Sequence, residues 1–428
     1  MLSSSKISTQ TLAQIVFYGI PFVFSFALIK ILIVFFGEAD YALYVVAFGA
    51  ALVARILVYN TAQSVFLRYF GLSEFRVATL VQLRRFMLMF LFAPAGVALI
   101  AATGFCTGLL ASVSQEFVIL LYGFLLGCGL GGIGVISEID NAHYSRPIGG
   151  AMILAVPVVQ TLLVPVAASF GIGIVGYLMG ASLSLLICAS FYATNFLGRA
   201  LSATELSGSW SEKLPLPVGF IAFIRQLSYW VVPTLLLKAA DRFVVANFFT
   251  VLELAAFGVC LMLTERIYAA SATVFSRVYN RKIYANLGSE DRSSNHRAVD
   301  GLVIVQLLIA AVLTVFYAFF GEFVLLSVAS REIANQSTLL TSLALTMGVM
   351  AAMHVQVLHG HIEGRPNPFL IVRILTGATY LSILLVLGPE KRVDGLIMAT
   401  VASAVVAVLT SMVATRCVRA SPAVRANA

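Results

Sequence analysis

Charge is scarce in this 428-residue chain: Asp, Glu, Lys and Arg together make up 11% of it, whereas hydrophobic residues make up 60%. Soluble globular proteins carry about 25% charged residues, because their surfaces face water. The chain therefore has too little charge to cover a surface in contact with water. This composition predicts an integral membrane protein whose surface faces lipid.

Reactive cysteine patterns and catalytic motifs are also missing. The five cysteines form neither a CxxC pair nor a Cys/His cluster, and all lie in or at the ends of apolar segments: Cys106, Cys128, Cys188, Cys260 and Cys417. We interpret them as small buried hydrophobic residues. The chain has no HExxH, GxSxG, P-loop or GxGxxG motif in a strand–helix context. We therefore expect no metal, no cofactor and no enzymatic activity.

Long loops are absent as well. The two longest segments between apolar runs, 196–217 and 280–299, hold roughly twenty residues each, whereas independent domains begin near about 50 residues. Neither segment can form a catalytic domain, so the function must reside in the apolar segments themselves.

Apolar runs long enough to cross a bilayer, about 20 residues each, fill most of the chain. We place them near 12–36, 41–67, 84–107, 117–137, 148–169, 172–195, 218–238, 254–279, 300–320, 337–358, 367–388 and 394–416. Backbone groups in lipid must be hydrogen-bonded within the segment, so these spans are expected to be helices. The sequence predicts an all-α integral membrane protein with about 12 transmembrane helices.

The distribution of Lys and Arg predicts the orientation. With the N-terminus in the cytoplasm, 18 of the 27 basic residues fall in cytoplasmic loops or span ends. Five fall on the outer side: Lys238, Arg242, Arg331, Lys391 and Arg392. Cytoplasmic loops of membrane proteins are enriched in positive charge, so we expect both termini in the cytoplasm. The net charge of +8 is thus an orientation signal, and no nucleic-acid partner is expected.

An internal repeat relates the two halves of the chain. Pro21 recurs as Pro233 and Lys30 as Arg242, each 212 positions later, and Arg55 recurs as Arg266 after 211. The string Phe35-Phe36…Asp40-x-Ala42-x-Tyr44 recurs as Phe248-Phe249…Glu253-x-Ala255-x-Phe257 at an offset of 213. Because each half begins and ends on the cytoplasmic side, the copies are expected to be parallel, with a substrate site between them near the midplane.

The repeat suggests a division into four parts. The predicted domains are an N-terminal six-helix half at 1–195, a cytoplasmic linker at 196–217, a C-terminal six-helix half at 218–418 and a cytoplasmic tail at 419–428.

Four cations lie inside the predicted first, second, seventh and eighth spans. A cation at the bilayer centre costs at least about 2.5–3.5 kcal/mol, so such residues normally face a cavity or a partner. Helical spacing places aromatic residues near Arg55 and Arg225. The candidate substrate-binding residues are the four cations and three tyrosines: Arg55, Arg266, Arg225, Lys30, Tyr59, Tyr44 and Tyr229.

Structural explanations stay open for three of these cations. Lys30 and Arg225 can extend toward the membrane interfaces. Arg266 can join a structural ion pair with Glu265, although adjacent helical residues point about 100° apart. Glu265 is the only acidic residue in the middle of a predicted span and is the candidate for proton or cation coupling.

Two further clusters receive structural interpretations. His354, His359, His361 and Glu363, near the inner end of the predicted tenth span, are interpreted as interfacial residues and not as a metal site. The Asp241-Arg242 pair is interpreted as part of an amphipathic outer segment.

Two junctions resemble those of a known family. These are the string Phe36-Gly37-Glu38-Ala39-Asp40-Tyr41-Ala42-Leu43-Tyr44 and the segment Lys238-Ala-Ala-Asp241-Arg242-Phe243. They are similar to junctions of polysaccharide-type (Wzx-like) flippases, which belong to the superfamily of multidrug, oligosaccharidyl-lipid and polysaccharide exporters. Ala42 and the segment Leu254-Ala255-Ala256 depart from the glycines usual in that family.

The resemblance implies a bacterial inner-membrane transporter that flips undecaprenyl-diphosphate-linked oligosaccharide outward for O-antigen, capsule or exopolysaccharide assembly. The expected partners are this lipid-linked substrate, membrane lipid, a polysaccharide polymerase and a chain-length regulator. The predicted cations agree, because arginine binds phosphate bidentately. One alternative is a multidrug extruder of the same superfamily. Another, from a different class, is a membrane-embedded polysaccharide polymerase or glycosyltransferase.

Overall fold

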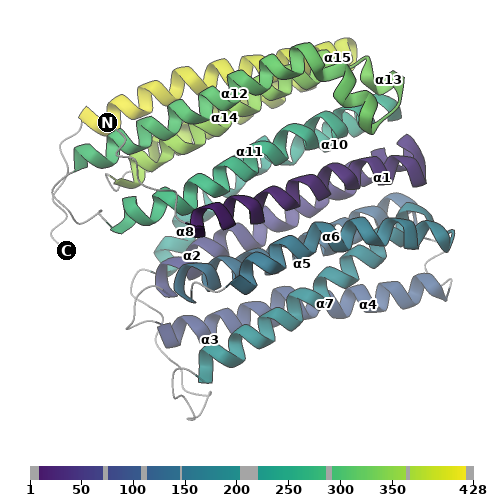
Figure 1. Cartoon of the computed structure of the whole chain (residues 1–428), viewed down its shortest axis with the longest axis horizontal. Coiled ribbons are helices and arrows are strands. Elements are labelled where there is room, and N and C mark those ends of the chain that lie inside the picture. The colour runs from purple at the N-terminus through teal and green to yellow at the C-terminus, as the bar shows by residue number, and fades with distance from the viewer. Residues whose placement is uncertain are drawn as a thin grey trace. The chain divides into compact units, whose positions relative to one another are not determined.

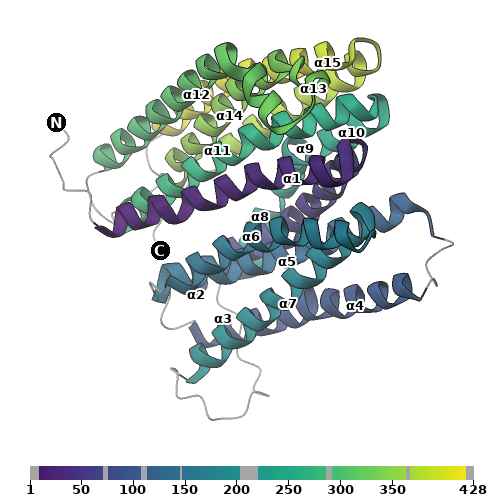
Figure 2. The same cartoon turned by 45° about the vertical axis from the view of Figure 1, so that its right-hand side comes forward.

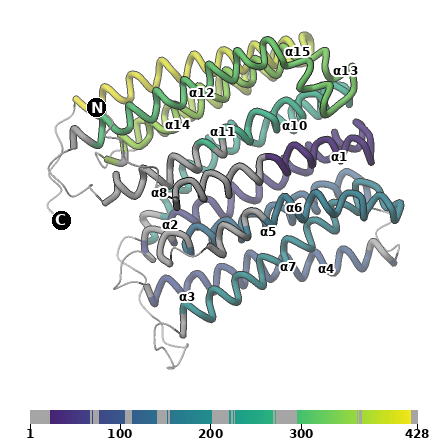
Figure 3. The backbone as a smooth tube through the Cα atoms, in the orientation of Figure 1, coloured from purple at the N-terminus to yellow at the C-terminus, as the bar shows by residue number. Residues whose placement is uncertain are grey.

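The computed structural model describes residues 9–70, 76–107, 113–144, 147–202, 220–285, 292–362 and 367–420 (Figures 1 and 3). Within these ranges every regular element is a helix, and no strand occurs. Seven described helices are long and apolar enough to cross a membrane: Val23–Phe66, Val77–Gly104, Gln115–Asp140, Gly173–Ala200, Asn295–Val328, Ser337–Gly360 and Asn367–Ala420. The prediction of an all-α multi-pass membrane protein is thereby confirmed, while the count of twelve spans and the cytoplasmic termini stay predictions.

The chain forms two compact units. The N-terminal unit is Val23–Ala239, and the C-terminal unit combines Met1–Phe22 with Ala240–Ala428. Each unit is described by itself below, and the four-part division predicted from the sequence stays a prediction.

Helix α5 has the most extensive packing in the N-terminal unit, where it lies against α6 and α7 (Figures 1 and 2). It also contacts α2, α4 and both π-helical segments. The elements of this unit are α1 (Thr9–Ala54, from Val23 onward), η1 (Arg55–Asn60), α2 (Thr61–Phe70), α3 (Arg76–Met87), η3 (Leu88–Phe92), α4 (Ala93–Cys106), α5 (Gln115–Tyr144), α6 (Pro147–Ser169), α7 (Gly173–Ser202), α8 (Phe220–Ser228) and α9 (Val231–Lys238).

Helix α1 contains one non-helical residue, Gly37, with φ 85° and ψ 173°. Only glycine adopts this backbone conformation without strain, because it has no Cβ. The chain turns back at this point (Figures 1 and 2). The break falls between the predicted spans 12–36 and 41–67.

A row of glycines on α5 permits close packing within the N-terminal unit. Gly123, Gly127 and Gly131 lie four residues apart and therefore share one face of the helix. A Cβ at Gly127 would collide with the backbone of Ala51, and one at Gly131 with the ring of Tyr59. Small residues at this spacing are typical of membrane helices, whose association depends on close backbone contact. The row fixes α1 and η1 against α5.

In the C-terminal unit, α14 contacts both α12 and α15, and the three helices run alongside one another (Figures 1 and 2). Helix α11 packs against α14, and α10 packs against α11 and α15. The elements are α10 (Ala240–Phe248), α11 (Val251–Ala285), α12 (Arg292–Val328), α13 (Arg331–Ala334), α14 (Ser337–Ile362) and α15 (Asn367–Ala420).

Helix α11 begins with a capping box. The Thr250 hydroxyl accepts a hydrogen bond from the backbone N–H of Glu253 at 3.3 Å, and the Glu253 carboxylate accepts one from the backbone N–H of Thr250 at 2.8 Å. This reciprocal arrangement satisfies two N–H groups that the first turn leaves without helical partners. It fixes the start of the helix that carries Glu265 and Arg266.

Helix α15 reverses direction at Arg392, whose φ is 46° and ψ −118°. A Cβ on Gly395 would lie 2.7 Å from the carbonyl oxygen of Leu387, eight residues earlier. In a straight helix eight residues span about 12 Å, so the chain must fold back on itself. The reversal falls between the predicted spans 367–388 and 394–416.

The interpretation of Asp241 and Arg242 as an amphipathic outer segment is wrong. Helical structure after the predicted span 218–238 continues in α10, and both residues are buried within it, with exposed fractions of 4% and 2%. A buried charge requires a partner, and here that partner comes from a helix later in the chain.

Candidate functional site

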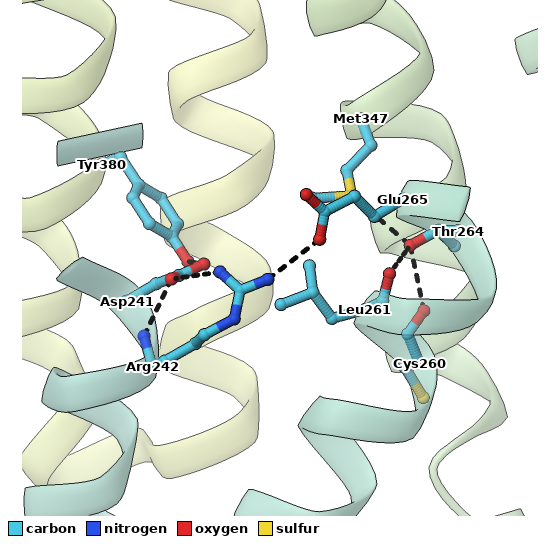
Figure 4. Close-up of polar contacts among 8 residues, drawn as sticks. All are labelled: Asp241, Arg242, Cys260, Leu261, Thr264, Glu265, Met347 and Tyr380. Atoms are coloured by element: carbon cyan, nitrogen blue, oxygen red, sulfur yellow. Dashed lines mark hydrogen bonds and ion pairs between the residues drawn. The ribbon is translucent and has the colours of Figure 1, made fainter. Parts of the chain in front are cut away.

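A buried ion cluster joins α10 to α11 in the C-terminal unit (Figure 4). The Arg242 guanidinium donates to the Glu265 carboxylate at 2.9 Å and lies 3.4 Å from the nearer Asp241 oxygen. The side chains of Arg242 and Asp241 are 3% and 5% exposed, while that of Glu265 is 27% exposed. The guanidinium is thus held between two carboxylates, of which only Glu265 is open to its surroundings.

Helix α15 completes this cluster. The hydroxyl of Tyr380 donates to the second Asp241 oxygen at 3.4 Å (Figure 4). Beside Glu265, the Thr264 hydroxyl donates to the Cys260 carbonyl oxygen at 2.9 Å and contacts the Met347 sulfur at 3.4 Å. Because the cluster contains one more acid than base, its partly exposed carboxylate can accept a proton or a small cation.

Glu265 forms an ion pair with Arg242, which comes from α10 and not from its own helix. Consecutive residues of a helix point in different directions, and the side chain of Arg266 is half-buried. The sequence indicated Glu265 as a candidate coupling residue but did not show its arginine partner, 23 positions earlier.

In the N-terminal unit, Arg55 begins the π-helix η1 and has an exposed side chain. π-helical turns are rare and occur frequently at functional sites. Arg55 interacts electrostatically with Glu138 on α5, the helix against which η1 packs. Sequence reasoning missed Glu138, because the predicted span ended at 137, whereas α5 continues to Tyr144.

Tyr44 and Tyr59 are not exposed alongside Arg55. Tyr44 is fully buried, with its ring centroid 6.2 Å from that of Tyr177. Tyr59 is 1% exposed, and its hydroxyl donates to the carbonyl oxygen of Phe90 in η3. The i→i+5 bonds of η1 change the direction of the side chains after Arg55, so a stripe drawn at 3.6 residues per turn does not continue through it. In this conformation neither tyrosine ring is open to a ligand.

The other predicted site residues are distributed over both units. Lys30 on α1, Arg225 on α8 and Tyr229 just after α8 are exposed residues of the N-terminal unit. Arg266, on α11, belongs to the C-terminal unit. The N-terminal unit therefore carries three of the four predicted cations on exposed side chains.

Of the predicted histidine group, His359 is buried where α12, α14 and α15 meet. Its Nδ1 atom lies 2.8 Å from Nδ1 of His296, and its Nε2 atom lies 3.2 Å from Asp300 and 3.1 Å from Arg419. These contacts join three helices of the C-terminal unit. His354 contacts Arg373 on α15. The side chain of His361 and the whole of Glu363 lie outside the described part of the chain.

Comparison with known proteins supports a transporter fold. No protein-family model and no curated relative matches the sequence. Solved structures of membrane transporters, however, match over nearly the full length of the chain. The protein therefore shares the fold of these solved transporter structures.

Three of the matched structures illustrate how similar this chain is to transporters of different kinds. A point mutant of the Vibrio cholerae MATE transporter VcmN is 16% identical, with 96% of both chains covered and a TM-score of 0.59. An outward-facing multidrug resistance MATE transporter is 13% identical, covering 96% of this chain and 95% of that one, with a TM-score of 0.62. The lipid II flippase MurJ in an inward closed conformation is 11% identical, covering 95% of this chain and 87% of that one, with a TM-score of 0.62.

Proposed function

We propose that the protein flips undecaprenyl-diphosphate-linked oligosaccharide from the inner to the outer leaflet of a bacterial cytoplasmic membrane. The product would supply O-antigen, capsule or exopolysaccharide assembly, with a polymerase and a chain-length regulator as partners. In this proposal twelve spans form two six-helix halves with cytoplasmic termini. Transport proceeds by alternating access through a cationic central cavity.

The observation that carries the proposal is the exposed charge of Arg55. It lies within the apolar helical segment Val23–Phe66, where an arginine costs at least about 2.5–3.5 kcal/mol unless it faces a cavity or partner. Arg55 interacts with Glu138, and its exposed side chain also leaves the guanidinium open to a second anion. A diphosphate is a compact anion that arginine binds with two parallel hydrogen bonds. Lys30 and Arg225 add two exposed positive charges in the same unit. A flippase of a lipid-linked diphosphate needs this kind of anion site.

The fold supports the same proposal, because one of the matched structures is a lipid II flippase. An inside-negative potential also favours outward movement of an anion, by about 2.3 kcal/mol per charge per 100 mV. Glu265, held by Arg242 but partly exposed, is the residue proposed to couple transport to a proton or cation.

A multidrug extruder is the second candidate, because MATE transporters share the fold. An exporter of organic cations requires acidic side chains open to its cavity. In the described part of the chain, Asp140 and Asp241 are buried, Glu138 interacts with Arg55, and Glu265 is paired with Arg242. The exposed cations therefore favour an anionic substrate.

Transport can be tested in proteoliposomes with a fluorescent undecaprenyl-diphosphate oligosaccharide and an impermeant quencher in the outer buffer. We expect the wild-type protein to move the lipid between leaflets and Arg55→Gln to do so at least about tenfold more slowly. Loss of hydrogen bonds to a charged group costs about 1.5–3 kcal/mol, and 1.4 kcal/mol is a factor of ten. Arg331→Gln, at an exposed arginine of α13, is the matched control and should retain wild-type transport.

Two results would contradict the proposal. One is a wild-type rate in Arg55→Gln. The other is a wild-type protein that moves ethidium, an organic cation, but leaves the diphosphate lipid in place. Polymer formation by the purified protein alone would support the polymerase alternative instead.

A further inference from the structure

Asp140 on α5 is a buried carboxylate that the flipping mechanism does not use. Its exposed fraction is 2%. One oxygen, Oδ2, accepts a hydrogen bond from the Tyr192 hydroxyl of α7 at 3.0 Å. The other, Oδ1, is buried and has no hydrogen-bond partner within the described part of the chain. Burying a polar atom without a partner is unfavourable, more so if the group is charged, and calls for a physical explanation.

A pocket of about 200 Å³ adjoins this carboxylate, between α5, α6 and α7 of the N-terminal unit. Because a water molecule occupies about 30 Å³ of liquid, the pocket has room for several small groups. Its walls are largely apolar, and aromatic residues of α7 form much of them. The lining residues are Asp140, Met152, Phe191, Tyr192, Asn195, Phe196 and Arg199.

Polar groups follow one another along α7 at this pocket. Tyr192, Asn195 and Arg199 are spaced three and four residues apart, so they lie on one face of the helix. At 1.5 Å per residue, Arg199 lies about 10.5 Å along the axis from Tyr192. Arg199 is in the last turn of α7 and is exposed. The pocket thus has an acidic inner end and a basic rim.

In the predicted orientation, the rim lies at the cytoplasmic surface, where it would meet lipid. Arg199 belongs to the basic residues predicted to lie on the cytoplasmic side. Phe191, one turn before Asn195, is 67% exposed. An arginine at the end of a membrane helix suits a lipid phosphate, and the exposed phenylalanine above it suits acyl chains.

We propose that this pocket binds the headgroup of a phospholipid with a primary ammonium group, as in phosphatidylethanolamine. The ammonium donates a hydrogen bond to Oδ1 of Asp140, and the phosphate accepts from Arg199 and lies beside Asn195. The acyl chains extend along Phe191. The headgroup supplies both a donor for the orphaned oxygen and a counter-charge for the arginine.

Other abundant headgroups satisfy only part of this arrangement. The trimethylammonium of phosphatidylcholine has no N–H to donate, and phosphatidylglycerol has no cation. The proposed transport substrate, a diphosphate-linked oligosaccharide, has no required ammonium either. The lipid site therefore stands independently of the proposed function.

The test is native mass spectrometry of the purified full chain, titrated with phospholipids that share the same acyl chains. We expect wild-type protein to bind phosphatidylethanolamine about tenfold more tightly than phosphatidylcholine. In the N-methyl and N,N-dimethyl series, the largest loss should come with the third methyl group, which removes the last N–H. This series needs no variant, so it remains informative if a substitution prevents folding. Equal binding across the series would overturn the proposal.

Single variants then test which part of the headgroup each end of the pocket binds. Asp140→Asn keeps the shape but removes the charge, and it should lower the preference for phosphatidylethanolamine over phosphatidylcholine about tenfold. Arg199→Gln should weaken the binding of phosphatidylethanolamine and of phosphatidylglycerol by similar factors, because both lipids carry the phosphate. The matched controls are Glu116→Gln at the other end of α5 and Arg416→Gln near the end of α15, both exposed, and neither should change binding. The proposed headgroup would be refuted if Asp140→Asn kept the full wild-type preference for phosphatidylethanolamine over phosphatidylcholine. It would also be refuted if the wild-type protein bound phosphatidylglycerol preferentially.

Discussion

Replacing Arg242 with methionine is expected to destabilise the protein more than any single neutralisation of the acids around it. The guanidinium lies 2.9 Å from Glu265 and 3.4 Å from Asp241, and only 3% of its side chain is exposed. Methionine fills a similar volume but leaves two neighbouring carboxylates without a cation. Glu265→Gln, in contrast, leaves Asp241 as the counter-charge of the arginine.

The size of the expected loss in unfolding free energy follows from these distances. At an effective dielectric constant of about 20, unit charges at the two separations attract each other by about 6 and about 5 kcal/mol before desolvation is subtracted. Removing one partner of a buried pair has a net cost of about 3–5 kcal/mol, which we expect for Arg242→Met. For Glu265→Gln we expect about 1–2 kcal/mol, because its side chain is 27% exposed and the amide oxygen still accepts a hydrogen bond from Arg242.

Equilibrium unfolding in mixed micelles of dodecyl maltoside and sodium dodecyl sulfate, followed by circular dichroism, measures these differences. The double variant Arg242→Met with Glu265→Gln should cost less than the sum of the single variants, by about 0.5–3 kcal/mol. Arg331→Met, at an exposed arginine of the same unit, should change stability by less than about 0.5 kcal/mol. Additive costs, or equal costs for Arg242→Met and Glu265→Gln, would refute the assignment of Arg242 as the shared counter-charge.

Two glycine substitutions test the backbone features of the N-terminal unit in the same assay. Gly127→Ala should lower the free energy of unfolding by about 1–3 kcal/mol, because its Cβ would meet the Ala51 backbone. The control is Gly134→Ala on the same helix, whose Cβ meets no described atom within 4 Å. Similar stabilities for the two variants would contradict the close contact. Gly37→Ala should cost about 1–3 kcal/mol through its backbone conformation, since its φ is 85° with nothing within 4 Å of the Cβ. Gly96→Ala, also without neighbours, is the control, and an unaffected Gly37→Ala would argue against the strained turn.

Composition and apolar runs predicted the class of fold because the bilayer allows few alternatives. Spans in lipid must be helical, and the breaks at Gly37 and Arg392 fall where the sequence showed short polar interruptions. These features depend on local sequence, which is why they could be predicted.

The burial of Asp241 and Arg242 could not be predicted in the same way. Their charges mark a membrane surface when only the local sequence is considered. In the folded chain they are compensated by Glu265 on the next helix and by Tyr380, 139 residues after Asp241. Such tertiary compensation leaves no local pattern.

The acids of α5 were missed for a related reason. Glu138 and Asp140 follow an apolar run, so the span seemed to end before them. The helix continues to Tyr144, and the partners of these acids, Arg55 and Tyr192, come from η1 and α7. Arg55 itself was predicted from its position in the span, but the π-helical turn that begins there has no recognised sequence signal.

The reversal of α15 at Arg392 has a consequence for biogenesis. The two arms of this helix are joined without a loop, so they form a tight helical hairpin. Its tip carries two acids and two bases: Glu390, Lys391, Arg392 and Asp394. In the predicted orientation this tip crosses the membrane, where each net charge would add about 2.3 kcal/mol of electrical work per 100 mV. A tip with no net charge is translocated without that work.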